Sequence, residues 1–136
     1  MGRADPEPVL PFREGMLLVP IIGIIDSQRA RQLTEQLLGS IRSNRAKMVV
    51  IDITGVQSVD TRVANHIVQT VEAARLMGAR VILAGISPEV AQTMVTLGID
   101  LGRILTVGDL QSGIERAEHM LGYVVARSRA SETAVG

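Results

Sequence analysis

The chain has 136 residues, equal numbers of acidic and basic side chains, and an aromatic content of only 1%. A chain of this length forms one domain and buries roughly two-thirds of its unfolded surface. Zero net charge and few aromatic side chains argue against nucleic-acid binding, and the absence of cysteine excludes disulfides and thiolate metal sites.

The N-terminal part of the sequence predicts a flexible lead-in followed by a β-hairpin. Residues 1–8 are polar and rich in proline, and they lack the apolar core of a signal peptide. Two short apolar runs follow, at 9–13 and 16–22, on either side of a Glu-Gly turn. Each run contains a proline, Pro11 in the first and Pro20 in the second, so we expect an edge position or a local irregularity in each strand.

The middle of the chain predicts a strand between two helices. Asp26 or Ser27 is expected to cap a helix of about four turns, whose apolar side chains recur at three- and four-residue spacing. The consecutive apolar residues at 47–53 predict a strand that is covered on both faces. A second helix is expected from about Thr61 to Met77.

The C-terminal third repeats this alternation in shorter form. A third covered strand is predicted at 80–84, followed by a short helix that is capped by Ser87. A weaker strand at 103–107 precedes a final helix that is capped by Asp109. The apolar stripe of this helix is expected to consist of Leu110, Ile114, Ala117 and Leu121. Residues 124–136 are small and polar, and we expect them to be disordered.

Together these elements predict a small α/β fold in a single domain over residues 9–123. Strands that alternate with helices at this spacing form a mostly parallel sheet with helices packed on it. We expect about four such strands plus an antiparallel edge strand from the N-terminal hairpin. No stretch is long and apolar enough to predict a transmembrane helix, and the lack of cysteine favours a cytoplasmic location.

The sequence contains no recognised catalytic or cofactor motif. A dinucleotide-binding glycine pattern, a phosphate-binding loop, a zinc-protease motif and a hydrolase elbow are all missing. His66 and His119 are far apart and lack metal-ligand spacing, and His66 is expected to be a hydrogen-bonded histidine at the surface or boundary of its helix. We therefore expect no enzyme activity, no metal and no cofactor.

Asp52 raises a separate hypothesis, because it stands near the end of a central strand like the phospho-acceptor of a receiver domain. That chemistry also needs an acidic pair after the first strand and a lysine after a later one. Asp26 stands alone, and Lys47 precedes Asp52 in the same strand. We therefore expect Asp52 to accept backbone N–H bonds in the loop that follows it.

Two hydroxyl groups stand at corresponding strand-to-helix junctions, Thr61 after Asp60 and Ser27 after Asp26. Helix capping is the simplest role for Thr61 alone, because a capping oxygen accepts a hydrogen bond from a free backbone N–H. If the preceding strands are parallel, however, both junctions lie at the same edge of the sheet, where such folds place functional groups. Phosphorylation there would add about −1.5 to −2 charges, which a helix N-terminus tolerates.

Several motifs in the chain resemble those of the STAS domain of stressosome proteins. The segments IDITGV, VDT, LMGA and GISPEVAQT carry the resemblance, which extends from about Leu10 to Leu121. The RsbR-type co-antagonists are the nearer match, and the smaller RsbS-type antagonists are related. In the RsbR-type pattern one acceptor threonine follows the aspartate of VDT, at Thr61 here. A second follows the aspartate after the first strand, at Ser27 here.

The resemblance implies a non-enzymatic, phospho-regulated STAS scaffold of the stressosome, which controls sigma factors in stress-response signalling. Such domains assemble with paralogous STAS proteins, here also as a homo-oligomer or dimer, and they hold and release a switch-type serine/threonine kinase. Thr61 would be the principal phosphorylation site and Ser27 the secondary one. The residues that are expected to contact the partner surround these hydroxyls: Asp26, Asp60, Arg62, Asn65 and Gln69.

The sequence leaves two alternative functions open. One is a stand-alone anti-anti-sigma factor that binds an anti-sigma factor, and the other is a sensor module for a nucleotide or small ligand. The sequence also departs from the RsbR-type pattern, because position 27 is serine rather than threonine. A short lead-in stands where such proteins carry an N-terminal sensory domain. We therefore expect either a stand-alone STAS protein or the C-terminal domain of a longer one.

Overall fold

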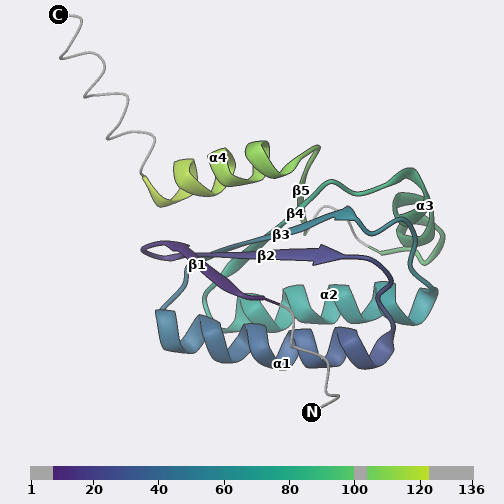
Figure 1. Cartoon of the computed structure of the whole chain (residues 1–136), viewed down its shortest axis with the longest axis horizontal. Coiled ribbons are helices and arrows are strands. Elements are labelled where there is room, and N and C mark those ends of the chain that lie inside the picture. Colours follow the sequence, from purple (N-terminus) through teal and green to yellow (C-terminus); the bar gives the residue numbers. More distant parts are fainter. Residues whose placement is uncertain (1–7, 100–103, 123–136) are drawn as a thin grey trace, which may run out of the picture.

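The computed structural model describes residues 8–99 and 104–122, and within them strands and helices alternate after an initial hairpin (Figure 1). In chain order these elements are β1 (Leu10–Arg13), β2 (Met16–Ile22), α1 (Ser27–Asn44), β3 (Met48–Gly55), α2 (Thr61–Leu76), β4 (Arg80–Ala84), α3 (Pro88–Thr96), β5 (Leu105–Val107) and α4 (Leu110–Leu121). The expectations for the lead-in before residue 8, for residue 103 and for the tail after residue 122 lie outside the described residues.

The strands form one five-stranded sheet in the order β1-β2-β3-β4-β5. Strand β1 pairs with β2 antiparallel, and β2, β3, β4 and β5 are parallel to one another. This arrangement confirms the predicted α/β fold, with its N-terminal antiparallel edge strand and four parallel strands. Because each parallel strand is followed by a helix, the strands end, and the next helices begin, at one edge of the sheet.

The two prolines of the hairpin have different positions. Pro11 lies in β1, at the edge of the sheet, where a missing backbone donor costs little. Pro20 lies in β2, which has β1 on one side and β3 on the other, so its strand is not at an edge. The register between β2 and β3 shifts between Pro20 and Ile22. Of the two alternatives expected for a strand with proline, an edge position or a local irregularity, β2 therefore shows the irregularity.

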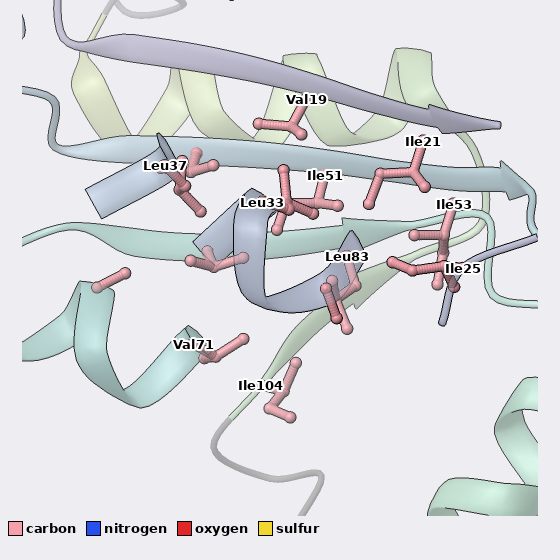
Figure 2. Close-up of a cluster of buried hydrophobic side chains, with 14 of the residues drawn as sticks. Val19, Ile21, Ile25, Leu33, Leu37, Ile51, Ile53, Val71, Leu83 and Ile104 are labelled. Carbon is pink, nitrogen blue, oxygen red and sulfur yellow. The ribbon is translucent and has the colours of Figure 1, made fainter. Parts of the chain in front are cut away.

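The larger hydrophobic core lies between the sheet and the pair of helices α1 and α2 (Figures 1 and 2). The side chains that α1 buries recur at the spacing that the sequence predicts: Ala30, Leu33, Leu37 and Ile41. Helix α2 also buries a polar residue, Thr70. Its hydroxyl donates to the carbonyl of His66 at 2.9 Å and lies 2.5 Å from the hydroxyl of Thr34 on α1, so the buried oxygen has hydrogen-bond partners.

A smaller core lies on the opposite face of the sheet, beneath α4 (Figure 1). Gly113 allows this helix to approach closely, because a Cβ atom there would lie 2.9 Å from the side chain of Val50. The expected apolar stripe of α4 faces this core: Ala117 is buried in it, and Leu110 and Leu121 pack against it. Gly113 and Glu118 are also buried, which the stripe did not predict. The carboxylate of Glu118 lies 3.1 Å from the guanidinium of Arg13, so an ion pair joins α4 to the hairpin.

Candidate functional site

The N-termini of α1, α2 and α3 gather at the edge of the sheet where β2, β3 and β4 end (Figure 1). Each described helix starts after a capping side chain that accepts a hydrogen bond from the backbone N–H three residues later. These capping residues are Asp26, Asp60, Ser87 and Asp109. Such an edge combines free N–H groups with the positive ends of the helix dipoles, which favours interaction with anions.

At the two junctions that the sequence singles out, the cap is the aspartate and not the hydroxyl. Asp26 Oδ1 accepts from the backbone N–H of Arg29 at 2.8 Å, and Asp60 Oδ1 accepts from that of Val63 at the same distance. The capping role expected for Thr61 is therefore wrong. Aspartate and threonine are both good caps, and here the first of the two residues takes the extended conformation that a cap requires.

The two hydroxyl residues are consequently the first residues of their helices. Thr61 opens α2 and is exposed, whereas Ser27 opens α1 and is half-buried. Within the described residues, neither hydroxyl has a hydrogen-bond partner. Modification of either hydroxyl would therefore break no hydrogen bond among the described residues. Adjacent parallel strands place them at the same edge, which confirms the arrangement expected from the sequence.

The other residues expected to contact a partner are all exposed, but they extend in two directions. Asp26, Asp60 and Arg62 lie with the hydroxyls at the edge. Asn65 and Gln69 continue along α2, about 6 and 12 Å from Thr61 at 1.5 Å per residue. The predicted surface is therefore the edge itself plus the first two turns of one face of α2.

Asp52 and Ser87 hold the backbone at this edge. Asp52 Oδ1 accepts from the backbone N–H of Thr54 at 3.0 Å and from its hydroxyl at 2.6 Å. The expected backbone N–H bond is therefore present, but its donor lies at the end of β3 and not in the loop that follows. Ser87 caps α3 and also donates to the carbonyl of Gln57 at 2.7 Å, so it joins α3 to the loop before α2. The sequence indicates the cap at Ser87, but it contains no signal for the second bond, because Gln57 is distant along the chain.

Arg29 fixes the loop between β2 and α1. Its guanidinium donates to the carbonyl of Ile22 at 2.8 Å and to the carbonyl of Ile24. Sequence reasoning missed this contact, because an arginine in the first turn of a helix is expected to point into solvent. The loop that leads to Ser27 is thus held by a charged side chain of the helix that it precedes.

Among the four capping groups, the carboxyl of Asp109 has a lowered pKa. At the start of α4, hydrogen bonds from the backbone N–H and then the hydroxyl of Ser112 hold the pKa of Asp109 below its ordinary value.

Among the described residues, no group of three or more histidine, aspartate or glutamate side chains could hold a metal ion. None of the described helices has the length and apolarity needed to cross a membrane.

His66 occupies an unexpected environment at the margin of a small cavity. The cavity lies between α1, α2 and the sheet, has a volume of about 20 Å³, and is lined mainly by aliphatic side chains such as Ile21, Leu33 and Ile53. His66 is half-buried, as a boundary residue should be, but its Nε2 has no hydrogen-bond partner among the described residues. The expected hydrogen bond is therefore missing at this nitrogen.

The pattern of the STAS domain family matches residues 7–109. The chain is 50% identical over 113 residues to the RsbT co-antagonist protein RsbRA of Bacillus subtilis, an alignment that covers 83% of this chain and 41% of that protein. It thus spans about two-fifths of the length of this relative. Among solved structures, RsbS of Moorella thermoacetica superimposes with a TM-score of 0.75 at 31% identity, over 86% of this chain and 98% of RsbS. A chain from the structure of the stressosome, a signal integration and transduction hub, superimposes with a TM-score of 0.73 at 31% identity. The superposition covers 84% of this chain and 98% of that chain.

Proposed function

The chain belongs to the STAS domain family, and we propose that it is a non-enzymatic, phospho-regulated scaffold module of a stressosome. In this proposal it acts in the cytoplasm, assembles with paralogous STAS domains, and holds and releases a switch-type serine/threonine kinase that controls stress-response signalling. The relatives support the class of function, since they are co-antagonists and a stressosome component. The observation that carries the proposal for this chain is the pair of unbonded hydroxyls at one edge.

Thr61 is the proposed principal phosphorylation site and Ser27 the secondary one. In the transfer, the hydroxyl oxygen attacks the γ-phosphorus of ATP, the bond to the β-phosphate oxygen breaks, ADP leaves, and a base of the kinase takes the hydroxyl proton. Thr61 is exposed and can enter a kinase active site as it stands, whereas Ser27 is half-buried. This difference in accessibility supports the order of the two sites.

The phosphate would change the binding of a partner rather than the stability of the fold. A phosphoryl group adds about −1.5 to −2 charges, and the free N–H groups of a helix N-terminus favour negative charge. Asp60 and Asp26 already place one carboxylate beside each hydroxyl. Modification would therefore convert a mildly acidic contact surface into a strongly anionic one. The added negative charge at the N-terminal end of α2 would then release a partner that binds Arg62, Asn65 and Gln69.

The proposal is tested with the cognate kinase and MgATP, followed by mass-spectrometric mapping of the phosphate. Phosphate is expected on Thr61 first and on Ser27 second, with each signal lost in Thr61→Ala or Ser27→Ala. Thr96→Ala is the matched control, because Thr96 is an exposed hydroxyl at the opposite end of a helix. Phosphate on other residues only, or none with a kinase that is active on another substrate, would contradict the assignment.

Two measurements separate the alternative functions. Light scattering after mixing with paralogous STAS domains should give very large particles for a scaffold and small complexes for an anti-anti-sigma factor. A nucleotide sensor needs a pocket of about 300 Å³ or more with polar groups for the phosphates. The cavity beneath His66 has about 20 Å³ and a mostly aliphatic lining, so this cavity is too small for a nucleotide. Calorimetric titration with nucleotides should accordingly show no heat of binding.

A further inference from the structure

Two large apolar side chains project into solvent immediately before Ser27. Ile22 is 74% exposed and Ile24 is 90% exposed. Single exposed apolar side chains are ordinary on protein surfaces. Two isoleucines within three residues expose apolar surface beside a proposed phosphorylation site. We call Ile22 and Ile24 the isoleucine pair.

The backbone on both sides of Ile24 is fixed. The N–H of Gly23 donates to the carbonyl of Gly55 at 3.2 Å, and the side chain of Ile25 is buried in the larger core (Figure 2). Arg29 donates to the carbonyls of Ile22 and Ile24. Because Ile25 points into the core and the carbonyls are held, Ile24 is directed outward. A side chain on an already ordered loop loses little backbone entropy when a partner covers it.

The position of Ile24 brings it inside the footprint of any protein that acts on Ser27. Three residues span at most about 11 Å of chain, so the two Cα atoms are no further apart than that. A stable interface covers about 800 Å² on each partner, which corresponds to a disc of roughly 16 Å radius. A kinase centred on Ser27 therefore covers Ile24, and it must either bury this side chain or leave it against a desolvated surface.

We propose that the isoleucine pair is the apolar anchor of the kinase complex, with Ile24 seated in a complementary apolar pocket beside the active site of the kinase. The inference rests on the proposed function and names the contact that gives the unmodified chain its affinity. Phosphorylation of Ser27 places a doubly charged group on a residue whose Cα lies within about 11 Å of the Cα of Ile24. The phosphate requires hydration, which opposes the desolvation on which the anchor depends, and the complex is released.

The test is calorimetric titration of the full chain with the cognate kinase in the absence of ATP, so that no phosphate is transferred. Ile24→Ala should weaken binding about tenfold or more, because three buried carbon atoms are lost. Leu76→Ala is the matched control, since Leu76 is also 90% exposed. It ends α2, about 22 Å along the helix from Thr61 and outside the footprint, so its variant should bind within about twofold of wild type.

The outcomes distinguish this inference from the proposed function. If wild type binds and the Ile24 and Leu76 variants bind equally well, the anchor is overturned while the proposed function stands. If wild type fails to bind an active kinase, both the anchor and the proposed function are overturned. Light scattering on the free chains adds a third result. Loss of self-association in Ile24→Ala, with kinase affinity unchanged, would assign the isoleucine pair to contacts between copies of this chain and would overturn the proposal.

Discussion

Exchange of Asp60 and Thr61 for alanine, one at a time, should separate the fold of this edge from its chemistry. Asp60 Oδ1 accepts the backbone N–H of Val63 at 2.8 Å, and Asp60→Ala leaves that donor without its partner. Loss of an N-cap costs about 0.5–2 kcal/mol, typically about 1 kcal/mol. For a domain of this size, 1 kcal/mol corresponds to a fall in Tm of about 4 °C.

Thr61→Ala should behave differently, because its hydroxyl has no hydrogen-bond partner among the described residues and its side chain is exposed. Surface substitutions without such contacts change the free energy of unfolding by about 0.5 kcal/mol or less. Phosphate transfer to position 61 should nevertheless be lost in this variant, while Ser27 remains available, and Asp60→Ala keeps the acceptor hydroxyl of Thr61. The two substitutions thus affect different quantities, although the residues are neighbours.

Urea unfolding followed by circular dichroism measures the stability of each variant, and kinase assays measure phosphate transfer. Asp60→Asn is the matched control, because asparagine caps helices about as well as aspartate but carries no charge. It should therefore unfold close to wild type. If Thr61→Ala lost about 1 kcal/mol while Asp60→Ala lost nothing, the threonine would be the cap and the assignment of roles would be refuted.

Three further substitutions or conditions test other parts of the structure. Gly85→Ala should destabilise the fold by at least about 1–2 kcal/mol in urea unfolding, because Gly85 has φ +80° and a Cβ atom would lie 2.0 Å from the hydroxyl of Thr54; unchanged stability would contradict this packing. The pKa of Asp109 is lower in the folded chain than its unfolded value of 3.8, so its ionised carboxylate stabilises the fold at pH values above 3.8. This contribution is lost as the pH falls through the lower folded pKa. The free energies of unfolding of wild type and Asp109→Asn should therefore differ above pH 3.8 and converge below the folded pKa. Arg13→Ala should cost about 1–2 kcal/mol, less than for a fully buried ion pair because the arginine side chain is 36% exposed; a double-mutant cycle with Glu118→Gln that gave no coupling would exclude the ion pair as the cause.

The order of elements could be predicted because it depends on local patterns. Apolar spacing in α1 gives the buried residues Ala30, Leu33, Leu37 and Ile41, and all four are buried in the structure. Alternation of strands and helices gives a parallel sheet, and the parallel sheet places Ser27 and Thr61 at one edge. The position of the candidate site thus followed from the fold class, before any side-chain contact was known.

The details that could not be predicted depend on contacts between distant residues or on small conformational differences. The buried position of Glu118 requires Arg13, which lies at the other end of the chain. The second bond of Ser87 requires the carbonyl of Gln57. The choice of Asp60 over Thr61 as the cap depends on one backbone conformation, and composition cannot distinguish two residues that both cap well.

The division of roles at each junction has a consequence for how this protein can change over time. Aspartate caps the helix, and the residue after it carries the hydroxyl, so a substitution at the second position removes no capping bond. If Ser27 and Thr61 are the acceptors proposed above, selection on phosphorylation can act at these positions independently of selection on helix capping. Exchange of serine for threonine, or loss of one acceptor, is accessible by a single mutation that the fold tolerates. Under the proposed function, related STAS domains are accordingly free to diverge in their response to a kinase while they retain a common fold.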